Sequence, residues 1–150
     1  MNNTNFRNTD QRSDDTLENI FIIIAGLILP LFLIPLIKIT GYSEIIEEIA
    51  KAMVVLFLIL KLPSHKSQIL AGIAFGFLFG LSESVFYLNN IFQLGDLRIF
   101  LQRFLWTIPM HIITVMVIVF AGSAGKRALI LGLIGAIVLH ILFNWVWLNY

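Results

Sequence analysis

Glu47, Glu48 and Lys51 stand within five residues of one another, at the head of the apolar run 52–60. An Asp, Lys or Arg at the centre of a membrane helix costs about 2.5–3.5 kcal/mol, so such groups persist where they pair or act. Two adjacent carboxylates can supply general acid and base chemistry. They also suit the first turn of a helix, so an interfacial cap is the alternative reading.

Four further polar residues lie in later apolar segments and complete the set of candidate catalytic residues: Glu83, His111, His140 and Asn144. His140 and Asn144 are four residues apart and so share one helix face. Tyr87 follows Glu83 at the same spacing and could donate a hydrogen bond to it.

These residue types suit hydrolysis by either of two routes. In the first, His111, His140 and Glu83 hold a Zn²⁺ ion, and Glu47 or Glu48 deprotonates a water. In the second, no metal is used: a glutamate backed by histidine activates water, and His140 or Asn144 stabilises the oxyanion. The chain has neither a His-Glu-x-x-His nor a Gly-x-Ser-x-Gly pattern, so the sequence leaves both routes open.

Simpler roles exist for several of these residues. A lone histidine inside a membrane is equally typical of a hydrogen bond between helices. Arg103, which precedes Thr107 and His111 at four-residue steps, could simply extend to the lipid headgroups or form an ion pair near them. Lys51 could serve as counter-ion to Glu47 or Glu48. His65 lies in the polar Pro-Ser-His-Lys loop, where no role is expected.

The elements that position these residues are predicted to be membrane helices. Of 150 residues, 59% are hydrophobic and 13% charged, and there is no cysteine, which excludes disulfides and thiolate chemistry. Residues 1–17 read as a disordered polar cytoplasmic tail and 18–150 as one transmembrane domain. The fold class is an all-α integral membrane protein with about five spans, at about 20–37, 44–62, 68–89, 99–121 and 128–148. Prolines at 30 and 35 are expected to bend the first, and Pro63 to end the second.

Basic residues outside the spans set the orientation. Six lie on one side and two on the other: Arg7, Arg12, Lys61, Lys66, Lys126 and Arg127 against Lys38 and Arg98. This asymmetry predicts a cytoplasmic N-terminus and an external C-terminus. Polar-tipped aromatic residues fall toward the outer ends of the spans, as an interfacial belt would: Tyr42, Tyr87, Trp106, Trp145, Trp147 and Tyr150.

Counted at 1.5 Å per residue, the ionisable groups of the last four spans fall in the outer half of the membrane or near its middle. Small residues recur every four positions on two of these spans: Gly72, Gly76, Gly80 and Ser84, then Gly132 and Ala136 before His140 and Asn144. Such stripes let helices approach closely, so Glu83 and His140 are predicted to face packed interfaces rather than lipid.

Together these motifs resemble one known family, the PrsW intramembrane proteases. The resemblance covers about residues 44–148 and rests on the following patterns: Glu47-Glu48-x-x-Lys51, Phe79-Gly80-x-x-Glu83-Ser84-x-x-Tyr87, Arg103 with His111, and His140-x-x-x-Asn144. The family is similar in turn to the CAAX prenyl endopeptidases and bacteriocin-immunity proteins. The latter usually carry Arg where this chain has Ala52 and lack the glutamate at 83.

The resemblance implies cleavage of a membrane-anchored protein near its outer face. Two departures are present: Ser84 stands where the family usually has Asn, and the chain is short, with one helix before the double glutamate. Accessory helices would then be missing or supplied by a homo-oligomer. The implied location is the cell membrane, with several passes through the bilayer.

Two other classes compete with an intramembrane protease. Intramembrane carboxylates and histidines also build proton relays in transporters and channels, but the inner halves of the last three spans carry no ionisable residue. A non-catalytic scaffold or immunity-type protein of the same fold is the other alternative. Nucleic-acid binding is set aside, because the net charge is +1 and no basic patch is present.

Overall fold

The computed structural model describes the backbone of residues 4–94 and 97–148 and the side chains of residues 20–86, 98, 101 and 104–146. Within these ranges the chain forms five α-helices, which confirms the predicted all-α fold. They are α1 (Thr4–Thr40), α2 (Ser43–Lys61), α3 (His65–Leu94), α4 (Leu97–Ala124) and α5 (Lys126–Leu148).

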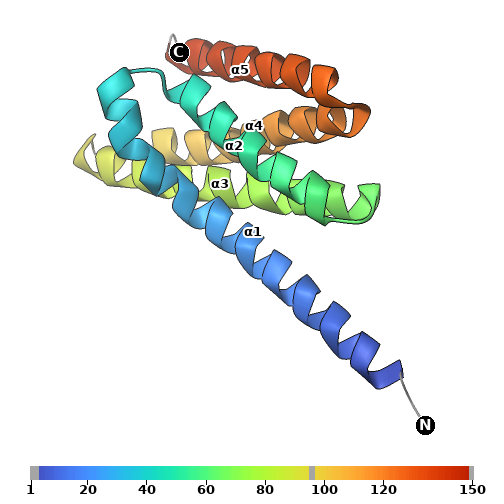
Figure 1. Ribbon diagram of the computed structural model, residues 1–150. Coiled ribbons are helices and arrows are strands. Elements are labelled where there is room, and N and C mark those ends of the chain that lie inside the picture. Colours follow the sequence, from blue (N-terminus) through green and yellow to red (C-terminus); the bar gives the residue numbers. More distant parts are fainter. Residues whose placement is uncertain (1–3, 95–96, 149–150) are drawn as a thin grey trace.

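The helices α3, α4 and α5 lie one above the other in Figure 1, and α2 crosses them obliquely. Helix α1 packs against α2 and α3, and its N-terminal part projects well beyond the other helices. Only α2 contacts each of the other four helices within the described residues. The segment with the paired glutamates therefore has helical neighbours on several sides.

Four helical segments are long and apolar enough to cross a membrane: Ile20–Thr40, His65–Phe86, Phe104–Ala124 and Lys126–Val146. Helix α2 has 19 residues and is not among them. Its first half carries four charged residues, namely Glu44, Glu47, Glu48 and Lys51. The protein is thus a multi-span membrane protein in which the helix with the largest share of charged residues also contacts all four other helices.

The helix ends agree with local sequence signals, with one exception. Helix α2 ends at Lys61, two residues before Pro63. Gly41 and Gly125 adopt positive φ angles of 76° and 123° and allow the sharp turns before α2 and α5. The exception is α1, which begins at Thr4, within the stretch 1–17 predicted to be disordered. Helical hydrogen bonds are local, so a polar segment can extend an apolar helix without tertiary contacts.

The small-residue stripe of α3 packs against α4, as the sequence predicts. A Cβ added at Gly76 would lie 2.9 Å from the Ile112 Cα, and one at Gly80 would lie 2.9 Å from the Ile108 Cα. Real Cβ atoms essentially never come that close, so these two positions admit only glycine at the observed separation of the helices. The approach of α3 to α4 sets the distance between Glu83 and His111.

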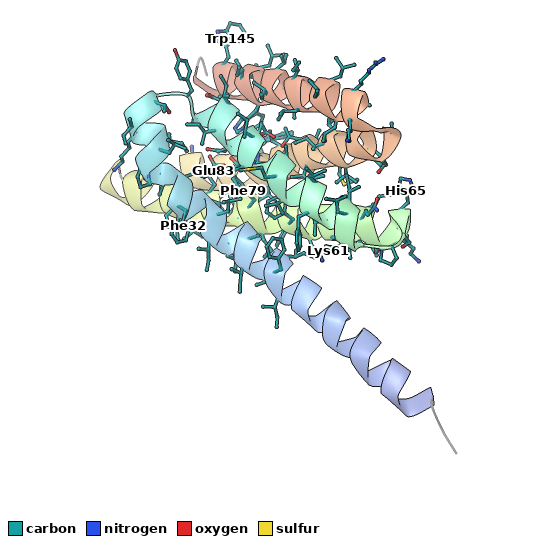
Figure 2. The ribbon with its side chains drawn as sticks, in the orientation of Figure 1. Phe32, Lys61, His65, Phe79, Glu83 and Trp145 are labelled. Atoms are coloured by element: carbon teal, nitrogen blue, oxygen red, sulfur yellow. The ribbon has the colours of Figure 1, made fainter. Side chains whose placement is uncertain are left out.

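The candidate catalytic residues and the polar α2–α3 connection lie in different parts of the bundle. Glu83 and Phe79 lie between the helices, whereas Lys61 and His65 lie toward the opposite end, where α2 leads into α3 (Figure 2). His65 is exposed.

Candidate active site

The charged residues of α2 point into the bundle. Glu48 and Lys51 are fully buried, and Glu47 is 7% exposed. They lie within one turn of each other, so a single helix face presents two carboxylates and an ammonium group. The exposed residues of α2, such as Ile49 and Met53, lie on its other side. This arrangement excludes the interfacial-cap reading, because a cap would leave the carboxylates in contact with solvent.

Lys51 links α2 to α4. Its ammonium donates to Glu48 Oε1 at 2.7 Å, to His111 Nδ1 at 2.6 Å and to Thr114 Oγ1 at 3.4 Å. It also lies 4.7 Å from the centre of the Phe79 ring, a cation–π contact. The predicted counter-ion role is confirmed, and the contact with His111 adds to it.

His111 is held from both ring nitrogens. An ammonium can only donate, so Nδ1 accepts from Lys51 and the proton of a neutral His111 lies on Nε2. Nε2 is hydrogen-bonded to Glu83 Oε2 on α3. The ring of Phe79, with its centre 5.1 Å away, covers the imidazole. Glu83 is the more accessible partner, with 17% of its side chain exposed against none for His111.

His140 brings α5 to the same place. Its Nδ1 is 2.8 Å from Glu48 Oε1, and its Nε2 is 4.0 Å from Glu47 Oε2. The ring centres of His140 and His111 are 5.4 Å apart, with the rings nearly perpendicular. Glu48 Oε1 therefore accepts hydrogen bonds from Lys51 and from His140. The other ring nitrogen of His140, Nε2, faces Glu47.

Asn144 lies one turn further along α5. Its Nδ2 donates to Glu44 Oε1 at 2.8 Å, and Ser43 Oγ donates to Glu44 Oε2 at 3.0 Å. Glu44 was predicted only as the start of a span, although its position four residues before Glu48 places it on the same helix face. Thr114, three residues after His111, was also missed. Their spacing from Glu48 and from His111 could have identified both residues from the sequence.

Two buried carboxylate oxygens, Glu47 Oε2 and Glu48 Oε2, lack a hydrogen-bond partner among the described residues. Glu47, Glu83 and His111 each offer a ligand atom, and these atoms lie within 4.8 Å of one another. Two carboxylates and an imidazole are typical ligands of Zn²⁺. The metal ligands predicted from the sequence were His111, His140 and Glu83, so Glu47 joins the group in place of His140.

All six predicted catalytic residues thus lie in one cluster built from α2, α3, α4 and α5. They are Glu47, Glu48, Glu83, His111, His140 and Asn144. The side chains of Tyr87 and Arg103, predicted to support the site, lie outside the described residues.

The family model described as "PrsW family intramembrane metalloprotease" matches residues 20–150. No curated protein and no solved structure matches the chain. The matched range contains every residue of the cluster and covers most of the 150 residues. A buried group of carboxylates and histidines among membrane helices is the arrangement that such an enzyme needs, and the chain belongs to the PrsW family of intramembrane metalloproteases.

Proposed function

We propose that this enzyme hydrolyses a peptide bond of a membrane-anchored protein near the outer membrane surface, at a site where Glu47, Glu83 and His111 hold a divalent cation. The observation that carries the proposal is the buried Glu47. Its Oε2 has no hydrogen-bond partner among the described residues, and one of its carboxylate oxygens lies within 4.8 Å of ligand atoms from Glu83 and His111. A buried carboxylate oxygen without a partner is unfavourable unless something binds it.

The donor set fits Zn²⁺, which favours nitrogen and carboxylate ligands and keeps one position open in catalytic sites. Such a cation would supply Lewis-acid polarisation of the peptide carbonyl or of a water molecule. A neutral His111 would bind the cation through Nε2 only in the tautomer that carries its proton on Nδ1. Binding would therefore replace the hydrogen bond between Nε2 and Glu83 and would require the contact between Nδ1 and Lys51 to rearrange.

The contacts of His140 support a role in proton transfer. With Nδ1 bound to Glu48, its Nε2 faces the Glu47 side of the cluster and can take a proton from water and pass it to the leaving amine. Glu48 holds the ring in the required tautomer, as carboxylates commonly do for catalytic histidines. Glu48 would therefore orient the His140 ring. The sequence alone had favoured Glu48 as the base that activates water.

Access supports attack from the Glu83 side. Glu48, Lys51 and His111 are fully buried, whereas 17% of the Glu83 side chain is exposed. A substrate chain would therefore meet the cluster at α3, with the buried polar network behind it. The basic-residue count predicts that this end of the bundle faces outward, which supports cleavage close to the external surface.

Metal content and cleavage test the proposal together. Purified wild-type protein, Glu47→Gln and His111→Gln are compared for bound zinc by mass spectrometry, with His65→Gln as a matched control at the exposed end of α3. In parallel, N-terminal peptide profiling of membranes follows tagged single-span proteins co-expressed with each variant.

We expect zinc and new N-termini with the wild type and His65→Gln, and loss of both in the two site variants. Cleavage that persists in Glu47→Gln would exclude the proposed ligand group. An active preparation without metal would leave the metal-free route as the mechanism.

A further inference from the structure

Helices α2 and α5 are joined by two consecutive hydrogen-bonded pairs. Glu48 pairs with His140 Nδ1 at 2.8 Å, and Glu44 pairs with Asn144 Nδ2 at 2.8 Å. Both spacings are four residues, one along each helix, so each partner lies one turn from its neighbour on the same face. The second pair therefore repeats the first, one turn closer to the end of α5.

Both carboxylate oxygens of Glu44 already accept a hydrogen bond within the chain. Asn144 donates to its Oε1 and Ser43 donates to its Oε2 at 3.0 Å. This differs from Glu47 and Glu48, each of which has an Oε2 without a partner. The carboxylate of Glu44 is thus satisfied within the chain, and its hydrogen bond to Asn144 links it directly to α5.

The two polar pairs hold the end of α5 near the site against α2. Neighbours of His140 on the other side of α5 are exposed, namely Leu139, Ile141 and Leu142. α5 packs closely on α4 near its beginning, where a Cβ added at Gly132 would overlap the Ala121 Cβ. A small rotation or shift of the distal part of α5 would carry Nε2 of His140 away from Glu47.

We propose that Glu44 and Asn144 form a positioning pair that fixes the rotation of α5 and so aims His140 Nε2 at Glu47. The proposal rests on the role proposed above for His140. It gives Asn144 a positioning role in place of the direct contact with the oxyanion predicted from the sequence, and it assigns a role to Glu44.

Exchange of the two partners tests the pair. Glu44→Ala and Asn144→Ala are each expected to lower the cleavage rate by about 10- to 100-fold, the effect seen when partners that orient a catalytic group are removed. The double variant Glu44→Asn/Asn144→Glu restores a carboxylate–amide bond between the helices and should recover most of the rate. Ile141→Ala, on the exposed side of α5, is the control and should behave as wild type.

Full activity in both alanine variants would overturn the proposal. So would a swapped double variant no more active than the single alanine variants, because then the bond itself does not matter.

A second readout does not depend on cleavage. The ¹⁵N NMR spectrum of histidine-labelled protein in detergent reports the proton on His140 Nδ1, and the three histidines are assigned with His65→Gln and His140→Gln. We expect the bonded Nδ1 proton in the wild type and the swapped variant, and its loss in both alanine variants. An unchanged signal in the alanine variants would refute the positioning role. If the wild type cleaves nothing, the proposed function fails while this test of the pair still stands.

The absence of cysteine allows a third measurement. In Glu44→Cys/Asn144→Cys, a short bis-methanethiosulfonate reagent should link α2 to α5, because the only two thiols of the chain face each other. The unlinked variant lacks the hydrogen-bonded pair, so we expect it to cleave slowly and the linked enzyme to recover part of the rate. A linked enzyme no faster than the unlinked one would contradict the positioning role.

Discussion

At Lys51, one buried ammonium group donates to Glu48 on its own helix and to His111 on α4. Removing one partner of a buried charge pair leaves the other without compensation, which typically costs about 3–5 kcal/mol. Here Glu48 would lose its counter-ion and one of its two hydrogen-bond donors, and His111 Nδ1 would lose its donor. The tautomer of His111 also depends on this contact, so the residue matters to the chemistry as well as to stability.

We therefore expect Lys51→Met to lower the unfolding temperature in detergent and to abolish cleavage. Lys51→Met/Glu48→Gln should recover part of the stability but none of the activity, because the unpaired carboxylate is removed while the proton network stays broken. Lys61→Met, at the exposed end of α2, is the control for loss of a lysine. A Lys51→Met protein as stable as the wild type would contradict the buried pairing.

Sequence reasoning could reach part of this network. The bond of Lys51 to Glu48 follows from a spacing of three along one helix, and the shared face of His140 and Asn144 follows from a spacing of four. The bonds of Lys51 to His111 and of Glu48 to His140 join residues 60 and 92 positions apart. Depth along each helix indicated that these groups lie at a similar level, but their rotation toward one another depends on packing that spacing does not encode.

On the scale of elements, α3 and α4 are held at a separation that only glycine permits. A Cβ at Gly76 would approach only α4 backbone: the Ile112 Cα at 2.9 Å, the His111 carbonyl oxygen at 3.0 Å and the Ile112 N at 3.2 Å. A Cβ at Gly80 would meet the Ile108 Cα at 2.9 Å and also the imidazole carbon Cδ2 of His111 at 3.0 Å. That carbon is bonded to Nε2, the nitrogen that faces Glu83.

A series of alanine substitutions separates packing from positioning. Gly76→Ala and Gly80→Ala should destabilise the protein to a similar extent, about 1–3 kcal/mol for overpacking. Zinc affinity should fall further in Gly80→Ala, because the added methyl group displaces the imidazole. Gly72→Ala should be mildest, since its nearest contacts are side-chain atoms of Val119 and Met116 that can move. Equal zinc affinity in the Gly76 and Gly80 variants would argue against this role of Gly80.

Element boundaries were predictable where a breaker residue marks them and not elsewhere. Pro63 follows the end of α2, and the positive-φ residues Gly41 and Gly125 precede the starts of α2 and α5. The start of α1 at Thr4 was not anticipated, because low hydrophobicity signals the absence of a core and not the absence of local hydrogen bonds.

At the scale of the whole molecule, the orientation in the membrane stays a prediction from the distribution of Lys and Arg. Five crossings from a cytoplasmic N-terminus would place Tyr42 outside and Ser64 inside. Because the chain has no cysteine, Tyr42→Cys and Ser64→Cys each introduce a single thiol at an exposed position. A membrane-impermeant maleimide should label the Tyr42 variant in intact cells and the Ser64 variant only after lysis. The reverse pattern would invert the orientation.

The burial of charge in α2 has a consequence for how the protein is made. Residues Glu48 and Lys51 leave the ribosome well before His140 and His111, which lie 92 and 60 positions later in the chain. During that interval α2 is too polar to rest stably among lipids, since each charged group is costly there. We expect α2 to settle in the bilayer only when α4 and α5 arrive, so that completion of the membrane-inserted chain and assembly of its active site are one event.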